Sequence, residues 1–386
     1  MERALAAVNG RGNLVARWIT NARYDLLWYL GPCIASYLVL WLHFGLAVKA
    51  ATLWWVWTLA FDGPHVFGTI NRTYFDREEW KVRGGLLLRS LLWFLPGPAI
   101  VLASIASGSK TPFYAFLLFA NLWAYWHVVR QHYGFLVLYQ KKNGEAAGSQ
   151  NRADWWCFYL LMLLPFVSVL LRNEHGRASL HELGLPLEPS AFERWLHYGV
   201  VTLISVVAVF YLGKEVRRLL GGQQFNLPKN LFLLSCVPLH LVVCLHPAIA
   251  IKIDPILFTT LVTLYHNFQY TGIVWFYNQN RYHQEDARGR YGVAARIARS
   301  FVPFYAVGLL FTVVLRYSYF YLAGTDSGPL MPGPNSVSRL DIGSGFTITE
   351  LAIAFWWGFA FNHYYLDQHI WRVSKDKALN RELKMA

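Results

Sequence analysis

The stretch LHYGVVTLISVVAVFYLG, residues 196–213, contains no Lys, Arg, Asp or Glu. As an α-helix rising 1.5 Å per residue it is roughly 27 Å long, which is close to the thickness of the hydrocarbon core of a bilayer. No water is available there to satisfy open backbone groups, so a helix is the conformation such a segment can adopt. The stretch therefore predicts a membrane-spanning helix.

Segments of the same kind recur along the chain and decide the fold class. Hydrophobic residues make up 55% of the chain and charged residues 15%, against about 25% in soluble domains. We expect an all-α, polytopic membrane helix bundle with about ten transmembrane helices, at residues 25–48, 51–71, 86–106, 112–139, 154–171, 196–213, 230–250, 255–277, 300–323 and 346–370. The stretch 324–345, rich in Gly, Pro and Ser, is expected to be a loop.

The net charge of +13 follows the connections between these segments. The connections around Lys49, Lys110, Lys252 and Arg339 are poor in basic residues, those at 72–85, 141–152, 214–229 and 278–299 are rich in them, and 172–195 is the least clear. This positive-inside pattern predicts an even number of spans with both termini cytoplasmic. The expected organisation is a cytoplasmic segment 1–24, a transmembrane domain 25–371 and a cytoplasmic tail 372–386.

The same pattern predicts the partner and the location. The basic residues are explained by the lipid bilayer, so no nucleic-acid partner is expected. The location is the cell membrane, which is the inner membrane if the protein is bacterial. The four Cys lie in apolar segments and form no CxxC pair, so neither a disulfide framework nor a Cys-based metal site is predicted.

Histidines within four of the expected spans carry the functional prediction, because ionisable residues inside a membrane are costly. They occur in FDGPH at 61–65, WHVVRQHYG at 126–134, YHNFQY at 265–270 and FNHYYLDQH at 361–369. Asp62 with His65 and His363 with Asp367 are spaced to share a helix face. Each of the four helices therefore offers an imidazole with a polar neighbour.

Depth in the membrane favours a common site. His65, His127, His266 and His363 follow the expected outer ends of their helices by 14, 15, 11 and 17 residues. At 1.5 Å per residue all four lie roughly 16–26 Å from the outer face. We predict that they bind a metal, with His132 and His369 as further candidate ligands nearer the cytoplasm. Asp62 and Asp367 are expected to ligate or to orient the imidazoles, and Arg130 to pair with a carboxylate or a polar substrate group.

Neutral imidazoles with one or two carboxylates suit iron, zinc or copper, and two axial histidines can instead hold haem. Each histidine can also be a hydrogen-bonded packing residue, and His65 after Gly63-Pro64 can simply occupy a kinked helix. A non-haem Fe(II) centre acting on a lipid-soluble substrate is the leading interpretation. The alternatives are a transporter that uses buried His and Asp side chains as a proton or cation pathway, and a membrane assembly protein without turnover.

The segment Gly63-Pro64-His65, followed by His-containing spans that end near Tyr364-Tyr365, resembles the Brp/Blh family of membrane β-carotene dioxygenases. That family has Pro-His-Gly where this chain has Pro64-His65-Val66. The resemblance implies an integral membrane oxygenase, with His65 as a ligand of iron. The chain otherwise looks like uncharacterised bacterial multi-pass membrane proteins. The function predicted is a membrane-embedded, metal-dependent oxidoreductase whose substrate is an isoprenoid, a fatty chain or a quinone.

Overall fold

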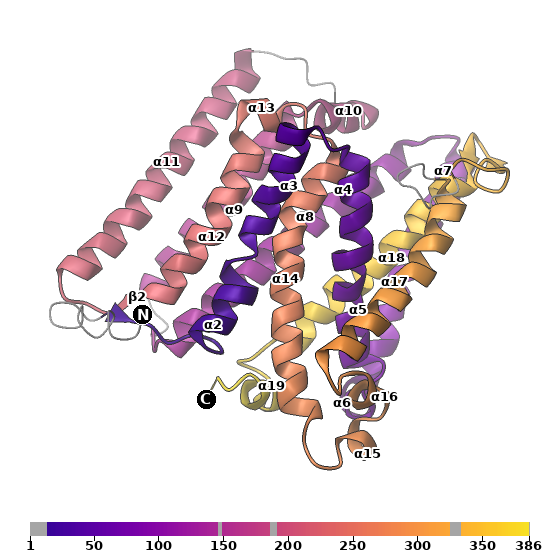
Figure 1. Cartoon of the computed structure of the whole chain (residues 1–386). Coiled ribbons are helices and arrows are strands. Elements are labelled where there is room, and N and C mark those ends of the chain that lie inside the picture. Colours follow the sequence, from indigo (N-terminus) through magenta and orange to yellow (C-terminus); the bar gives the residue numbers. More distant parts are fainter. Residues whose placement is uncertain (1–13, 146–148, 186–190, 325–332, 386) are drawn as a thin grey trace. The chain divides into compact units, whose positions relative to one another are not determined.

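The computed structural model describes residues 14–145, 149–185, 191–324 and 333–385, and Figure 1 shows a chain dominated by helices. The chain divides into two compact units, which are described separately. Unit 1 comprises residues 1–37, 128–258 and 385, and unit 2 comprises residues 38–127, 259–384 and 386. The division passes through three helices, α3 (Cys33–Leu46), α8 (Thr111–Lys142) and α14 (Pro255–Tyr282).

Unit 1 is built on α9, which packs against α11 and α12. Its elements are β1 (Leu14–Val15), α2 (Ala22–Asp25), η1 (Leu26–Leu30), α9 (Ser149–Arg172), α10 (Glu174–Glu182), α11 (Ala191–Leu220), β2 (Phe225–Asn226), α12 (Leu227–Leu245) and α13 (Pro247–Ala250). The two short strands pair in parallel. Lys229 is fully buried, and its Nζ lies 3.1 Å from Glu145 and 3.1 Å from Asp154, so its charge is compensated inside the unit.

Unit 2 is built around α18, which packs against α5, η3, α7 and α17. Its elements are α4 (Ala50–Trp57), η2 (Thr58–Asp62), α5 (Gly63–Thr73), α6 (Arg77–Ser90), η3 (Leu91–Phe94), α7 (Pro96–Ser107), α15 (Ala287–Tyr291), α16 (Val293–Ile297), α17 (Phe301–Ala323), β3 (Asp341–Gly343), β4 (Phe346–Thr347), α18 (Ile348–Ile370) and α19 (Lys377–Glu382). A capping box of Thr347 and Glu350 starts α18.

Small residues bring the helices of unit 2 close together. A Cβ added at Gly63 on α5 would lie 2.0 Å from the Thr312 side chain on α17. One added at Gly97 on α7 would lie 2.0 Å from the Ala354 carbonyl oxygen on α18. Close backbone approach through small residues is the usual way in which helices associate within membranes. These contacts hold α5 and α18, which both carry site residues, against their neighbours.

The expected span 51–71 is interrupted at its centre. The structure has α4, the π-helix η2 and then α5, with Pro64 in the first turn of α5. A proline removes one backbone hydrogen bond and clashes with the preceding turn, which accounts for the irregular winding before it. π-Helical turns are frequently found at functional sites, and this one ends three residues before His65.

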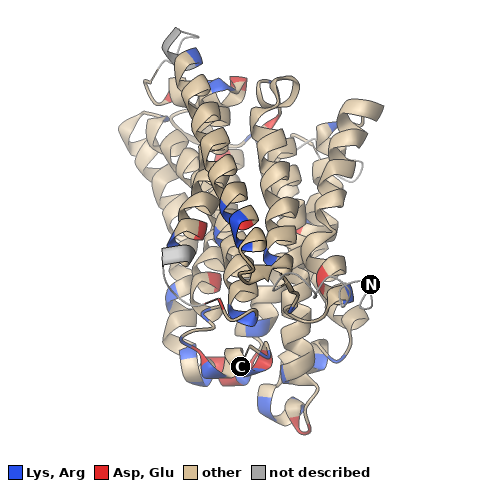
Figure 2. Cartoon of the chain, turned by 90° about the vertical axis from the view of Figure 1, so that its left-hand side faces the viewer, with Lys and Arg blue, Asp and Glu red and all other residues tan. Residues whose placement is uncertain are grey.

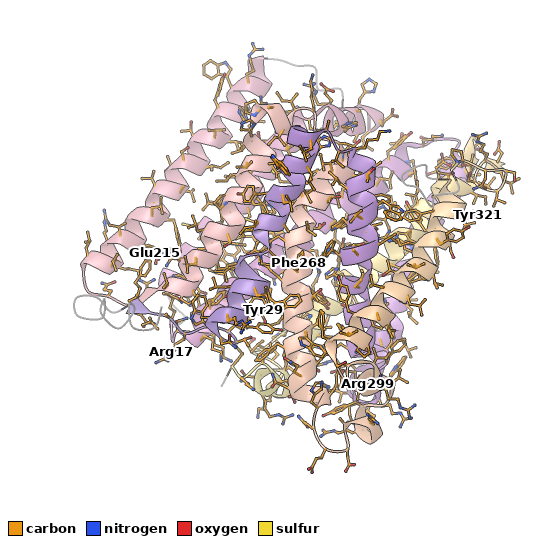
Figure 3. All side chains as sticks on the ribbon, viewed as in Figure 1. Arg17, Tyr29, Glu215, Phe268, Arg299 and Tyr321 are labelled. Atoms are coloured by element: carbon orange, nitrogen blue, oxygen red, sulfur yellow. The ribbon has the colours of Figure 1, made fainter. Side chains whose placement is uncertain are left out.

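The predicted all-α bundle of membrane-type helices is confirmed. Each of the ten expected segments is largely helical. Among the residues that the structure describes, six helices are long and apolar enough to cross a membrane: Ala22–Leu46, Arg77–Ser107, Asn151–Arg172, Arg194–Leu220, Leu227–Leu245 and Phe301–Ala323. The side chains of Val302 and Leu310 on α17 are 74% and 64% exposed, as expected for a surface that faces lipid. Arg299 and Tyr321 lie at the two ends of this helix (Figure 3).

The connections contain short elements that were not expected, with α10 inside 172–195 and α15 and α16 inside 278–299. The predicted loop 324–345 contains β3, which pairs antiparallel with β4. Positive φ angles at Gly343, Ser344 and Gly345 form the turn between them, and glycine adopts such angles at little cost. Residues 325–332 of this loop, and residues 1–13 of the predicted segment 1–24, lie outside the described residues. The number of crossings, the two boundaries between the three expected regions and the cytoplasmic location of the termini stay predictions.

Charged residues of unit 2 gather on α6, α15 and α19, close to the C-terminus in Figure 2. Ion pairs form in this region: Arg281 of α14 has Nε 2.9 Å from Asp76, the N-cap residue of α6, and Arg83 of α6 contacts both Glu79 and Asp376, the N-cap residue of α19. Burial opposes the charge of Arg83 while the two carboxylates favour it, and its pKa is raised as a result. The charged end of unit 2 is therefore an ion-pair network.

Candidate metal centre

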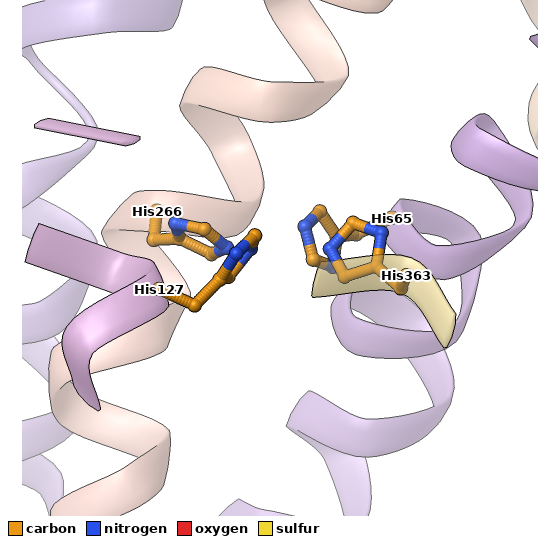
Figure 4. Close-up of side chains that lie close together, drawn as sticks. All are labelled: His65, His127, His266 and His363. Carbon is orange, nitrogen blue, oxygen red and sulfur yellow. The ribbon is translucent and has the colours of Figure 1, made fainter. Parts of the chain in front are cut away.

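Four buried histidines from four helices converge within unit 2. His65 lies in the first turn of α5, His127 on α8, His266 on α14 and His363 on α18. Each ring offers one nitrogen, and these four atoms all lie within 4.8 Å of one another. Figure 4 shows the four rings turned toward a common centre. The four helices are far apart in sequence, so the cluster is formed by tertiary structure alone.

The rings form a closed circuit of edge-to-face contacts. The ring centroids are 4.8 Å apart for His65 and His266, 5.0 Å for His266 and His127, 4.9 Å for His127 and His363, and 4.4 Å for His363 and His65. Adjacent ring planes are inclined by 67–79°. Nitrogen lone pairs lie in the ring plane, so rings arranged in this way can direct four lone pairs at one ion.

Several ring nitrogens lack a hydrogen-bond partner of acceptable geometry. These are Nδ1 and Nε2 of His65, Nε2 of His127 and Nε2 of His363. All three residues are buried, and leaving a buried polar atom unpaired costs roughly 1–3 kcal/mol. Two nitrogens bound to one ion at about 2.0–2.1 Å each can be at most about 4.2 Å apart. The four ligand atoms lie within 4.8 Å of one another. If each side chain moved by a few tenths of an ångström, these distances would fall within that limit, so the residues fit a metal.

A polar network of Thr69, Tyr270 and Asp367 contacts His363 at Nδ1. Its Nδ1 lies 2.7 Å from the Thr69 hydroxyl on α5. Thr69 donates to Oδ1 of Asp367 at 3.0 Å, and the Tyr270 hydroxyl on α14 donates to the same oxygen at 2.9 Å. Metal-binding histidines almost always have such a partner on the second nitrogen, which fixes the orientation of the ring.

The network fits one tautomer of His363. When the Thr69 hydroxyl donates to Asp367, it accepts from Nδ1–H of His363. Nε2 then carries the lone pair, and this atom has no hydrogen-bond partner. Oδ2 of Asp367 lies 3.6 Å from it, beyond hydrogen-bond distance. Asp367 is thus connected to His363 through Thr69, and its predicted role of orienting the imidazole stays a prediction.

Aromatic side chains enclose the other side of the cluster. The His127 ring stacks on Tyr364 with centroids 4.2 Å apart. Trp123 continues the contact, at 5.8 Å from Tyr364 and 4.8 Å from Phe361. Tyr364, Trp123 and Phe361 belong to a larger apolar core of α7, α8 and α18, against which Trp93 of η3 also packs. The cluster thus has a polar side near Thr69 and an apolar aromatic side near Tyr364.

Four predicted site residues lie elsewhere. Asp62 pairs with Arg316 of α17, because a buried carboxylate requires a cation. Arg130 and His132 belong to unit 1, where Arg130 donates to the Tyr159 hydroxyl at 2.8 Å and the His132 ring lies 5.6 Å from His240. In unit 2, Nδ1 of His369 lies 2.7 Å from the Tyr365 carbonyl oxygen. None of the four is part of the histidine cluster.

Sequence reasoning assigned no role to Thr69, Tyr270 or Tyr364. One signal was available for Thr69, which follows His65 by four residues and therefore lies on the same helix face. Tyr270 has the same spacing from His266. Neither spacing shows that the two hydroxyls meet at Asp367, because three helices must first pack together.

Comparisons of the chain with family models, with curated proteins and with solved structures find no match. The fold and the site therefore define the class on their own. The chain is a multi-pass, α-helical membrane-type protein with a buried cluster of histidines that can bind a metal.

Proposed function

We propose that the protein is a membrane-embedded, metal-dependent oxidoreductase that acts on a lipophilic substrate. The observation that carries the proposal is the convergence of four buried imidazoles, with ligand atoms within 4.8 Å of one another. His65, His127, His266 and His363 would hold the metal. A buried group of this kind within a membrane-type bundle is costly, and such groups are typically retained for function.

Iron is the metal proposed. Imidazole ligands suit iron, zinc, copper and nickel, and no cysteine belongs to the cluster. Four nitrogens would complete a tetrahedral zinc site, whereas six-coordinate Fe(II) would keep positions open for dioxygen and substrate. Haem fits the cluster poorly, because rings with centroids 4.4–5.0 Å apart leave no space for a macrocycle among them.

The residues around the cluster have defined tasks under this proposal. Thr69 and Asp367 hold His363 in the tautomer that presents Nε2, and Tyr270 holds Asp367. The packed rings of Tyr364 and Trp123 keep water from that side. Bound iron supplies the activation of dioxygen. Cleavage of a carbon–carbon double bond by one dioxygen into two carbonyl groups is balanced without an external reductant.

The surroundings favour a lipophilic substrate. The aromatic core next to His127 is apolar, and the helices of unit 2 expose apolar side chains such as Leu102 and Leu310. A substrate dissolved in the bilayer could enter laterally. The resemblance of Gly63-Pro64-His65 to the Brp/Blh motif favours an isoprenoid or a similar long chain.

Metal analysis of the protein purified in detergent tests the proposal. We expect about one iron per chain, lost in H65A and H363A and retained in the matched control H369A, whose ring nitrogen contacts a backbone carbonyl. Nitric oxide added to the Fe(II) protein without oxygen is expected to give an EPR signal, which reports an open coordination position. Lipid extracts of cells with and without the protein then reveal the substrate and its product.

Other results would replace the proposal. Stoichiometric zinc that binds no further ligand would indicate a structural metal site. Protein that retains no metal and moves protons across liposome membranes would favour a proton pathway through the buried His and Asp side chains. Equal iron content in wild type, H65A and H363A would show that the cluster is not the metal site.

A further inference from the structure

Arg72 on α5 is fully buried and packs against two aromatic rings. Its guanidinium carbon lies 4.1 Å from the centre of the Tyr277 ring and 3.7 Å from that of Trp371. Nη2 donates to the backbone carbonyl of Ile370 at 2.7 Å. The two ring centroids are 5.9 Å apart and the ring planes are inclined by 71°, so the rings cover two adjoining sides of the guanidinium and not its two opposite faces.

The remaining donors of Arg72 have no partner. Neither Nε nor Nη1 forms a hydrogen bond, and among the described residues no carboxylate oxygen lies within 4.0 Å of the guanidinium. The adjacent Asn71 and the residue that follows Tyr277, Asn278, are also fully buried with both amide atoms unpartnered. The buried Arg281 and the partly buried Arg316 of unit 2 differ in this respect, because each contacts a carboxylate.

A purely structural role explains only part of this arrangement. Arg72 caps the C-terminal end of α18 through Ile370, where a cation is favoured by the helix dipole. That role uses Nη2 and leaves Nε and both hydrogens of Nη1 unpaired. Unpaired donors on a buried charged group cost more than those on a neutral one. An anion at the free edge would satisfy them.

We propose that Arg72 binds the carboxylate of a long-chain amphiphile, and that this amphiphile is the substrate of the histidine cluster. The assignment as substrate rests on the proposed function, whereas the binding site itself does not. His65, Thr69 and Arg72 share one face of α5. Arg72 follows His65 by seven residues, which is roughly 10 Å along the helix. If Arg72 held the carboxylate of such an amphiphile, a carbon atom several bonds further along its hydrocarbon chain would reach the histidine cluster.

Charge balance favours an anionic ligand. Four neutral imidazoles bring no negative charge to a divalent ion, and Asp367 can offset only one positive charge near Arg72 and the cluster. Buried charge without compensation is strongly unfavourable. A single guanidinium carries one positive charge, which suits a monoanion such as a carboxylate. Asp367 and Asp376 interact electrostatically with Arg72 without forming an ion pair with it, so an uncharged hydrocarbon would leave the free donors of Arg72 without an anion.

Binding of a fluorescent fatty acid tests the site. The probe is cis-parinaric acid, compared with its methyl ester, on the full chain purified in detergent. We expect wild type to bind the acid at least tenfold more tightly than the ester. R72Q should weaken acid binding by about 10- to 100-fold and leave ester binding unchanged. R72K should restore part of the loss, and R89Q, which changes an exposed arginine of α6, should have no effect.

Competition and a second variant separate the outcomes. Oleate should displace the probe, whereas oleyl alcohol should not. Equal affinity of wild type for cis-parinaric acid and for its methyl ester would overturn the proposal. Stronger displacement by a lysophosphatidate would overturn the choice of a carboxylate. If R72Q does not fold, the proposal is tested by the affinity of R72K for the acid and by the preference of wild type for the acid over the ester. H363A, which should lose metal and still bind the acid, separates failure of the metal site from failure at Arg72.

Discussion

Replacing Thr69 by valine tests whether the polar network tunes the metal site. The two side chains have nearly the same shape, so the substitution removes a hydroxyl with little change in packing. That hydroxyl accepts from Nδ1 of His363 at 2.7 Å and donates to Asp367 at 3.0 Å. In T69V the His363 ring loses the partner that sets its tautomer and orientation, while Asp367 keeps the Tyr270 hydroxyl.

The expected size of the effect follows from these contacts. Mutation of such an outer partner typically weakens metal binding by about 10- to 100-fold, which corresponds to roughly 1.4–2.8 kcal/mol. A lost hydrogen bond to a charged group costs roughly 1.5–3 kcal/mol. The two ranges of free energy agree, so T69V should bind iron tens of times more weakly. The variant should keep the fold, because valine and threonine have nearly the same shape.

Competition against a chelator of known affinity measures the iron dissociation constant directly. T73V is the matched control, because Thr73 is buried on the same helix and its hydroxyl donates only to the Thr69 carbonyl. T69S restores the hydroxyl and should restore the affinity. Unchanged affinity in T69V, or an equal loss in T73V, would refute the role assigned to Thr69.

Three further predictions follow from the same structure. H266A should lose its metal and H132A should keep it, as measured by metal analysis, because only the first ring belongs to the cluster. Acidification from about pH 7 to pH 5 should leave the metal bound, since burial disfavours the charged imidazolium form that would compete with the metal; metal content after desalting at each pH measures this. G97A should lower the melting temperature, because its Cβ would lie 2.0 Å from the Ala354 carbonyl oxygen; overpacking costs roughly 1–3 kcal/mol. G134A, with open space around its Cβ, should not lower it.

The helices and the common level of four histidines could be predicted because both are local properties. Hydropathy identifies a span, and a rise of 1.5 Å per residue fixes how deep each histidine lies. The direction in which each side chain leaves its helix was not used in the prediction. His132 follows His127 by five residues, a rotation of roughly 140° around α8, and His369 follows His363 by six, roughly 240° around α18. The same arithmetic would have kept both away from the site.

Other parts of the site could not be predicted from single helices. Asp62 has the spacing to share a face with His65, yet it ends the π-helix η2 and pairs with Arg316, more than 250 positions later in the chain. Thr69, Tyr270 and Asp367 come from three helices that are neighbours only in the folded unit. Pairings of this kind depend on tertiary packing, which periodicity within one helix does not contain.

The hydropathy of the helices explains how unit 2 can hold such a site. The expected spans that do not count among the six most apolar helices are 51–71, 112–139, 255–277 and 346–370, which are the four that carry the cluster. Polar groups such as His363 and Asp367 make α18 a poor span by itself, because lipid cannot solvate them. In unit 2, α18 lies against α7 and α17, whose apolar side chains face outward. The polar helices can therefore remain in the membrane only while apolar ones cover them, so the packing of α7 and α17 is a condition for the metal centre.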